Sequence, residues 1–198
     1  MSETGSARQD PGPVVVGVDG SVVSEQALLW AAEHAYRIGA DLRVVLVRTH
    51  PVPVTAVAPA PVWPWPVVHQ RNEQDVAKTS ELLREIVTAT IPATYDTRVT
   101  VDVVDGDSAS GLIEMAREHR ASMIVVGRRG RGGFKRLLLG SVSDEVATYA
   151  TCPVVVTSKA QNWRPESTIV VGVDGSDDSD RALAWAAEQA RLAGSRLH

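Results

Sequence analysis

The sequence predicts an α/β domain built on a five-stranded parallel sheet with helices on both faces, followed by a partial second copy of the same domain. From residue 13 to residue 157, short β-branched runs alternate with longer amphipathic stretches, an order typical of parallel sheets with right-handed crossover helices. In addition, residues 13–43 recur as residues 168–198 at a constant offset of 155, with 17 of the 31 aligned positions identical. An offset of one domain length indicates one whole domain and the opening of another.

The first strand, helix and second strand are predicted between residues 14 and 47. A valine-rich run over residues 14–18 ends at Asp19-Gly20 and is typical of a strand buried on both faces. A helix follows, with Ser24 as its predicted N-cap and Gly39 as its end, because its apolar residues recur every three or four positions. Residues 42–47 form the second predicted strand.

The rest of the first domain continues the alternation. We expect helices at residues 74–89, 108–119 and 141–150, and strands at residues 97–104, 123–126 and 154–157. The apolar stripe of the helix over 74–89 consists of Val76, Leu82, Leu83, Ile86 and Val87. Since ligands of such sheets bind beyond the carboxyl ends of the strands, the candidate site lies in the turns after Val18, Val47, Val104 and Val126.

A serine turn at residues 106–111 resembles a hydrolase nucleophile only superficially. It lacks the Gly-x-Ser-x-Gly spacing, and no partner histidine and acid can be identified. Asp107 or Ser108 is therefore predicted to cap the helix that follows.

The composition of the 198-residue chain excludes several classes of function. A net charge of −4 and a pI near 5.7 disfavour a protein that wraps nucleic acid. A single cysteine, Cys152, excludes an internal disulfide framework and is interpreted as a small buried residue before the last strand. The five histidines are scattered without the spacing of metal ligands, so no metal site is predicted.

Neither a signal peptide nor a membrane span is predicted. Residues 1–12 lack an apolar core and are expected to be a disordered tail. Residues 49–70 carry no charged side chain, but they hold six of the eleven prolines, a density that a spanning helix does not tolerate. We therefore expect a soluble, cytoplasmic protein. Trp63 and Trp65 in this insertion are interpreted as either a hydrophobic flap or a partner patch.

The turn after the fourth predicted strand has the chemistry of a polyphosphate cradle. Gly127, Gly130 and Gly140 let the backbone approach a ligand without an intervening Cβ. Gly140-Ser141 stands where a helix begins, so that free N–H groups and the positive end of the helix dipole can receive an anion. The hydroxyl groups of Ser141 and Ser143 can add hydrogen bonds to such a ligand.

Five of the nine residues 128–136 are cationic, which also fits a phosphate ligand. A purely structural turn is one alternative, and an RNA-binding RGG tract is another. True tracts of that kind are long and flanked by disorder, whereas this loop stands between an apolar strand and an apolar helix. We therefore expect no nucleic-acid partner.

The spacing Gly127-x₂-Gly130-x₉-Gly140-Ser141 resembles the nucleotide-binding signature of the universal stress protein family. Three further motifs resemble that family: the opening VVGVDGS, the strand IVVG before the loop, and the ending GSVSDEVATYATCPVVV. The resemblance covers residues 13–157 and begins again at residue 168. It implies a Rossmann-like fold of the adenine nucleotide alpha hydrolase-like kind, with ATP, alone or with Mg²⁺, held between the ends of the first and fourth strands. It also implies a homodimer, or a pseudo-dimer of tandem domains, formed through the last strand.

The resemblance assigns a role to each matching residue. Gly17 and Asp19 would face the adenosine, and the backbone of Val47 would contact the adenine. The loop would surround the phosphates with Gly127, Arg128, Arg129, Gly130, Arg131, Gly132, Gly140, Ser141, Val142 and Ser143. The presence of every signature glycine favours the ATP-binding branch of the family. A merely structural Asp19, ending the strand and capping the turn, is the alternative, and its recurrence as Asp174 favours the binding role.

These observations predict an ATP-binding stress-response sensor or regulator rather than a dedicated catalyst. The sequence shows no Walker lysine loop and no evident base for phosphoryl transfer, so no catalytic residue is assigned. A slow ATP hydrolase and a nucleotide-free interaction module are the alternatives.

The predicted domain division follows from the repeat. The tail covers residues 1–12, the first domain 13–158, a linker 159–167 and a truncated second domain 168–198. The last segment includes an apolar strand predicted over residues 169–173. It contains no second glycine loop, which predicts one nucleotide per chain.

Overall fold

A computed structural model describes residues 11–49, 73–130, 138–158 and 167–198 of the chain. The chain divides into two compact units, Met1–Ser158 and Lys159–His198, and each is described by itself. No helix in the described ranges is long and apolar enough to cross a membrane. The predicted tail, the proline-rich insertion with its two tryptophans, and the linker lie almost wholly outside the described residues.

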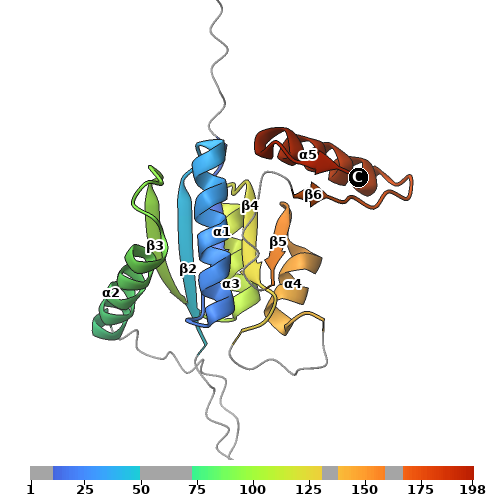
Figure 1. Cartoon of the computed structure of the whole chain (residues 1–198). Helices are drawn as coiled ribbons and strands as arrows, with labels where there is room; N and C mark the ends of the chain where they lie inside the picture. Colours follow the sequence, from blue (N-terminus) through green and yellow to red (C-terminus); the bar gives the residue numbers. More distant parts are fainter. Residues whose placement is uncertain (1–10, 50–72, 131–137, 159–166) are drawn as a thin grey trace, which may run out of the picture. The chain divides into compact units, whose positions relative to one another are not determined.

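The first unit has the predicted five-stranded parallel sheet with helices on both faces (Figure 1). Its strands are β1 Val14–Gly17, β2 Leu42–Arg48, β3 Val99–Asp105, β4 Met123–Gly127 and β5 Val154–Thr157. Its helices are α1 Val22–Ile38, α2 Glu73–Thr90, α3 Ser108–Glu118 and α4 Ser141–Tyr149. The strand order is β3-β2-β1-β4-β5, and every neighbouring pair is parallel. The winding direction therefore reverses between β1 and β4, where ligands of such sheets bind.

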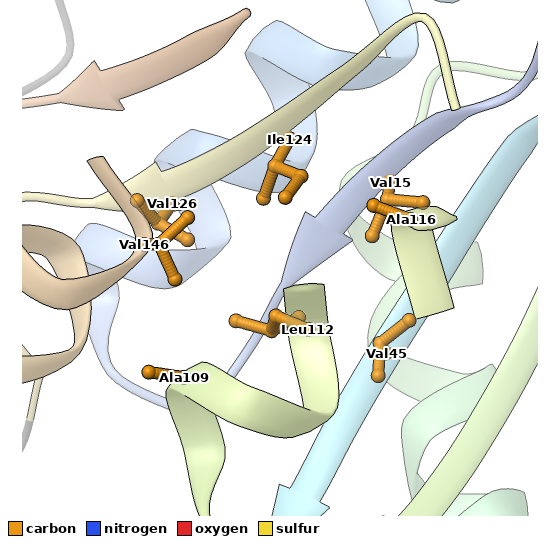
Figure 2. Packing of buried hydrophobic residues seen from close by; sticks show 8 residues of the cluster. All are labelled: Val15, Val45, Ala109, Leu112, Ala116, Ile124, Val126 and Val146. Carbon is orange, nitrogen blue, oxygen red and sulfur yellow. The ribbon is translucent and has the colours of Figure 1, made fainter. Parts of the chain in front are cut away.

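The two faces of the sheet carry separate apolar cores. Toward α3 and α4, Val15, Val45, Ile124 and Val126 of the strands pack against Leu112 and other side chains of the helices (Figure 2). Because side chains alternate along a strand, Val14, Val16 and Val44 point to the opposite face, toward α1 and α2. All three are fully buried. Valine-rich strands therefore form here because both faces of the sheet are covered.

The start of α1 corrects one prediction. Ser21, not Ser24, is the N-cap, and its Oγ accepts a hydrogen bond from the N–H of Ser24 at 3.2 Å. Ser24 lies in the first helical turn, where it is buried and donates its hydroxyl hydrogen to the Ser21 carbonyl at 2.8 Å. Gly20, with φ of 75°, turns the chain into this cap, a conformation that favours glycine.

Two details of α2 and α3 also bear on the predictions. Asp107 is the N-cap of α3, as expected, and its Oδ2 accepts a hydrogen bond from the N–H of Ser110 at 3.0 Å.

In α2, Leu83 and Val87 are buried as predicted, but Leu82 is 58% exposed. The predicted apolar stripe of α2 is therefore wider than the face that the helix buries.

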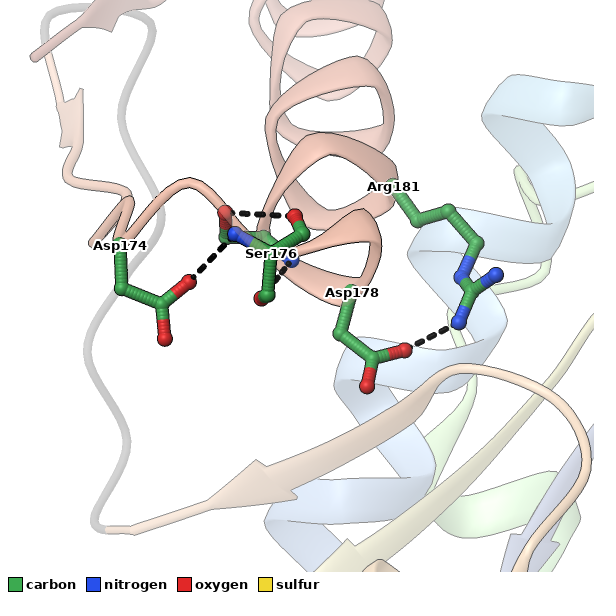
Figure 3. A network of polar contacts seen from close by, with 5 residues as sticks. Asp174, Ser176, Asp178 and Arg181 are labelled. Atoms are coloured by element: carbon green, nitrogen blue, oxygen red, sulfur yellow. Dashed lines mark hydrogen bonds and ion pairs between the residues drawn. The ribbon is translucent and has the colours of Figure 1, made fainter.

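The second unit consists of β6 Thr168–Ile169, α5 Asp177–Ala193 and β7 Arg196–Leu197. It repeats the strand, helix and strand that open the first unit, with the same register. Ile169 pairs with Leu197 as Val14 pairs with Leu42. Ser176 caps α5, and Asp174 accepts a hydrogen bond from the N–H of Ser176 at 3.0 Å (Figure 3).

The strand predicted over residues 169–173 is wrong in its extent, because only Thr168 and Ile169 are strand. Val170 and Val173 are 78% and 60% exposed. The physical reason lies in the pairing. In the first unit β1 has a partner on each side, β2 and β4, whereas the sheet of the second unit contains only β6 and β7.

Candidate functional site

A cavity of about 140 Å³ opens at the carboxyl ends of β1, β2 and β4. Six of its thirteen described lining residues are apolar, namely Val18, Val45, Val47, Leu112, Val126 and Val142. Polar side chains and glycines complete it, namely Asp19, Ser24, Ser108, Arg129, Gly17, Gly127 and Gly130. An engineered cavity of similar volume, about 150 Å³, holds benzene. The cavity therefore has room for one flat ring, with polar groups at its edge.

Asp19 has a structural contact as well as a place in the cavity wall. Its Oδ1 accepts a hydrogen bond from the N–H of Ser21 at 3.0 Å, and its own N–H donates to Ser24 Oγ at 3.3 Å. These contacts hold the turn between β1 and α1. The structural interpretation of Asp19 and the site interpretation are therefore compatible, since the same carboxylate serves the turn and lines the cavity.

Gly130 lies against that carboxylate. A Cβ at this position would overlap Asp19 Oδ2, so glycine lets the loop after β4 approach the end of β1 without displacing that carboxylate. The two strands are neighbours in the sheet. The glycine loop therefore closes over the reversal point at which the cavity opens.

At Gly17 and Gly127, the neighbouring helices leave little room for a side chain. A Cβ on Gly17 would lie 2.7 Å from Leu112 Cδ1 of α3. A Cβ on Gly127 would lie 3.0 Å from Val23 Cγ1 in the first turn of α1. A side chain at position 127 would therefore meet the first turn of α1, while the glycine itself lines the cavity.

The two ends of the glycine loop are joined by hydrogen bonds. The carbonyl oxygen of Arg128 accepts from the N–H of Gly140 at 2.8 Å and from the hydroxyl of Ser143 at 3.1 Å. Ser143 is buried, and its Oγ also accepts from the N–H of Gly140 at 3.0 Å. The hydroxyl of Ser143 therefore joins the two ends of the loop, and its role as a phosphate contact stays a prediction.

The N-terminus of α4 offers N–H groups beside the loop. The first hydrogen bond of the helix runs from the N–H of Asp144 to the carbonyl of Gly140. The N–H groups of Ser141, Val142 and Ser143 precede it, so that they carry the partial positive charge of a helix start. Ser141 is exposed, while Val142 reaches the cavity wall.

Seven of the thirteen predicted residues line the cavity: Gly17, Asp19, Val47, Gly127, Arg129, Gly130 and Val142. Four others lie at the hydrogen-bonded ends of the glycine loop or at the start of α4, namely Arg128, Gly140, Ser141 and Ser143. Arg131 and Gly132 lie outside the described residues.

Six lining residues were not assigned to the site from the sequence: Val18, Ser24, Val45, Ser108, Leu112 and Val126. Val18 and Val126 were named only as the strand ends that the candidate turns follow. Val45 could have been found, because it lies two positions before Val47 on the same face of a strand. Ser108 starts α3 immediately after Asp107, whose pKa is lowered chiefly by the hydrogen bonds from Ser110. The position of Ser108 at the cavity depends on tertiary packing, which cannot be predicted from local sequence patterns.

Comparison with solved structures supports the fold. A universal stress protein from Archaeoglobus fulgidus DSM 4304 aligns with a TM-score of 0.66 at 24% identity, covering 96% of this chain and 65% of that one. A universal stress protein crystallised in complex with cAMP aligns with a TM-score of 0.53 at 22% identity, covering 77% of this chain and all of that one.

Sequence comparison identifies the family. Universal stress protein Rv2005c of Mycobacterium tuberculosis is 36% identical over 194 residues, which cover 93% of this chain and 61% of that protein. Universal stress protein Rv2624c of the same organism is 31% identical over 188 residues, at 90% and 61% coverage. The chain thus spans about three fifths of the length of these relatives. The family model matches residues 12–158 and 167–198, and the chain belongs to the universal stress protein family.

Proposed function

We propose that this protein binds ATP in the cavity between β1 and β4 and acts as a nucleotide-dependent sensor or regulator of a stress response. The observation that carries the proposal is the meeting of a ring-sized apolar cavity with a glycine loop and a helix N-terminus. The adenine would enter between the valines, with the backbone of Val47 at its edge. The phosphates would lie over the loop, toward the N–H groups of Ser141 and Val142.

Charge favours the same orientation. Arg129 lines the cavity on the side of the loop, where it can face a phosphate, while Asp19 lines the side of β1 and can accept hydrogen bonds from the sugar or the base. The cAMP-bound relative supports a nucleotide ligand, because a protein of this fold holds an adenine nucleotide. Mg²⁺, where it is present, would accompany the phosphates rather than occupy a preformed protein site. Among the described residues, no group of three or more His, Cys, Asp or Glu side chains could hold a metal ion.

The assembly belongs to the proposal as well. β5 lies at one edge of the sheet and its four residues are half-buried. We infer that this edge pairs with a second copy or with a second domain of the same kind. The second unit would then be the opening of such a domain, since it repeats the first strand, helix and strand with the same register.

The direct test is to purify the protein from cells and identify the nucleotide that it carries. Bound ATP supports the sensor, and ADP with measurable turnover supports a slow hydrolase. Titration calorimetry of the nucleotide-free protein with ATP, AMP and GTP, each with and without Mg²⁺, completes the test. Absence of any bound nucleotide, together with no heat of ATP binding, would leave the nucleotide-free interaction module as the function.

A further inference from the structure

A second cavity, of about 180 Å³, lies on the opposite face of the sheet, between α1 and α2. The alternation of side chains along β2 separates the two cavities. Val45 and Val47 face the first cavity, whereas Leu46, between them in sequence, faces the second. The second cavity is therefore a distinct site, although its wall shares Val18, Asp19 and Ser24 with the first.

The floor of this cavity is aliphatic. Val18, Leu28, Leu46, Leu82, Leu83 and Ile86 line it, from β2, α1, α2 and the end of β1. Its volume exceeds that of the engineered apolar cavity, about 150 Å³, that holds benzene. Leu82 is 58% exposed, so this part of the aliphatic wall is open to solvent and accessible to a ligand. The cavity is therefore suited to an apolar group about as large as benzene.

The polar rim of the cavity is acidic. Asp19 and Glu25 line it together with Gly20 and Ser24, and among the residues that the structure describes no lysine, arginine or histidine lines it. Asp19 is engaged with the turn before α1. Glu25, in the first turn of α1, has no ion-pair partner among the described residues and is exposed to solvent. A ligand with an apolar body in the cavity can thus place a cationic head beside Glu25.

We propose that the cavity between α1 and α2 binds a small organic cation, such as a primary amine, whose apolar part is about the size of benzene. The apolar part displaces water from the aliphatic wall, and the ammonium group donates hydrogen bonds to the Glu25 carboxylate. Binding at this site requires no nucleotide, so it does not depend on the function proposed above.

The test uses benzylamine as the probe, with benzyl alcohol and benzoate as neutral and anionic analogues of the same shape. Methyl resonances of the full-length protein are followed by NMR during titration without nucleotide. We expect saturable shifts for leucine and isoleucine methyl groups of the cavity with benzylamine, weaker binding of benzyl alcohol and still weaker binding of benzoate. Absence of saturable shifts in these methyl groups, or benzoate binding as tightly as benzylamine, overturns the proposal.

Two variants locate the site. Glu25→Gln should weaken benzylamine binding about two- to fivefold, the effect of one exposed ion pair, and should leave benzyl alcohol binding unchanged. The matched control Glu85→Gln removes an exposed carboxylate of α2 that does not line the cavity, and should change neither. Ile86→Phe should block all three probes by filling the cavity, and circular dichroism checks that this variant is folded. Equal benzylamine affinity of the Glu25→Gln variant and the unaltered protein contradicts the assigned head-group contact.

Discussion

Gly130 carries the strongest single-residue constraint on the proposed nucleotide site. A side chain there would collide with the Asp19 carboxylate, so Gly130→Val must displace either that carboxylate or the loop, both of which line the cavity. Overpacking typically costs about 1–3 kcal/mol of stability, and because the displaced groups line the cavity, we expect ATP binding to weaken by an amount of that order while the domain stays folded. Calorimetry measures the change.

The second unit offers a control for the glycine-to-valine change itself. Gly172 is the repeat equivalent of Gly17, and a Cβ there would meet no atom within 4 Å. Gly172→Val should therefore leave ATP binding unchanged. If Gly130→Val binds ATP as tightly as the unaltered protein, the loop does not take part in binding.

His34 is a second residue with a measurable consequence. It is buried in α1, and its ring stacks on Trp30 with centroids 5.0 Å apart. Burial, reinforced by the positive charge of Arg37, lowers the pKa of His34 from 6.5 to about 4. The folded protein therefore holds a neutral imidazole, whereas the unfolded chain takes up a proton below pH 6.5.

This difference in protonation means that the free energy of unfolding decreases as the pH falls. The stability due to neutral His34 is present above pH 6.5 and is lost as the pH falls toward 4, by about 2 kcal/mol between pH 7 and pH 5. His34→Gln, which introduces the residue found at the repeat position Gln189, should reduce that loss. Urea denaturation at the two pH values provides the measurement. An equally steep loss of stability in the variant would assign the pH effect to other groups.

At the scale of elements, the loop between β4 and α4 depends on one buried hydroxyl. Ser143→Ala removes the hydrogen bonds of this hydroxyl to the N–H of Gly140 and to the carbonyl of Arg128, and leaves the direct backbone bond between Gly140 and Arg128 in place. We therefore expect a loss of about 1–2 kcal/mol of folding stability and weaker ATP binding. Ser141→Ala, on the exposed neighbour, should leave stability within about 0.5 kcal/mol. Thermal melts and calorimetry of both variants separate the roles. If the two variants melt alike, Ser143 does not hold the loop.

The elements also show what sequence can and cannot predict here. All nine elements that the structure describes in the first domain were predicted, most within two residues of their bounds, because valine runs and helical periodicity are local signals. The cap of α1 was misplaced because Ser21 and Ser24 are both acceptable caps, and only the geometry around Gly20 selects between them. The extent of β6 was overestimated because a strand persists only where neighbours pair with it. The cavity residues Ser108 and Leu112 come together only through packing of α3, which the sequence does not encode locally.

At the scale of the whole molecule, the second unit has a large exposed apolar surface. Its exposed aliphatic residues are Val170, Val173, Leu183, Leu192 and Leu197. Leu183 is the repeat equivalent of Leu28, which is fully buried in the first unit. The face that α1 packs against its sheet is thus partly open in α5, and such surface promotes association.

Deleting residues 159–198 should therefore leave ATP binding intact and raise solubility. The first unit contains its own sheet, both helix layers and every lining residue of the cavity, so it needs nothing from the second. Calorimetry and light scattering of the shortened protein provide the readouts. Unfolding of the first unit, or loss of ATP binding, would make the second unit an integral part of the domain.

The strand order has a consequence for folding of the protein during its synthesis on the ribosome. β1 emerges first, yet it lies at the centre of the sheet and acquires its second neighbour only when β4 follows, late in the synthesis of the domain. The proposed binding cavity likewise needs residues from both ends of that stretch, Val18 and Val142. A nascent chain therefore has no ATP site until the domain is nearly finished, and the nucleotide then stabilises only chains that have completed the fold. If the protein binds ATP as proposed, the cellular ATP concentration would influence the fraction of newly synthesised chains that stay folded, before any of them acts as a sensor.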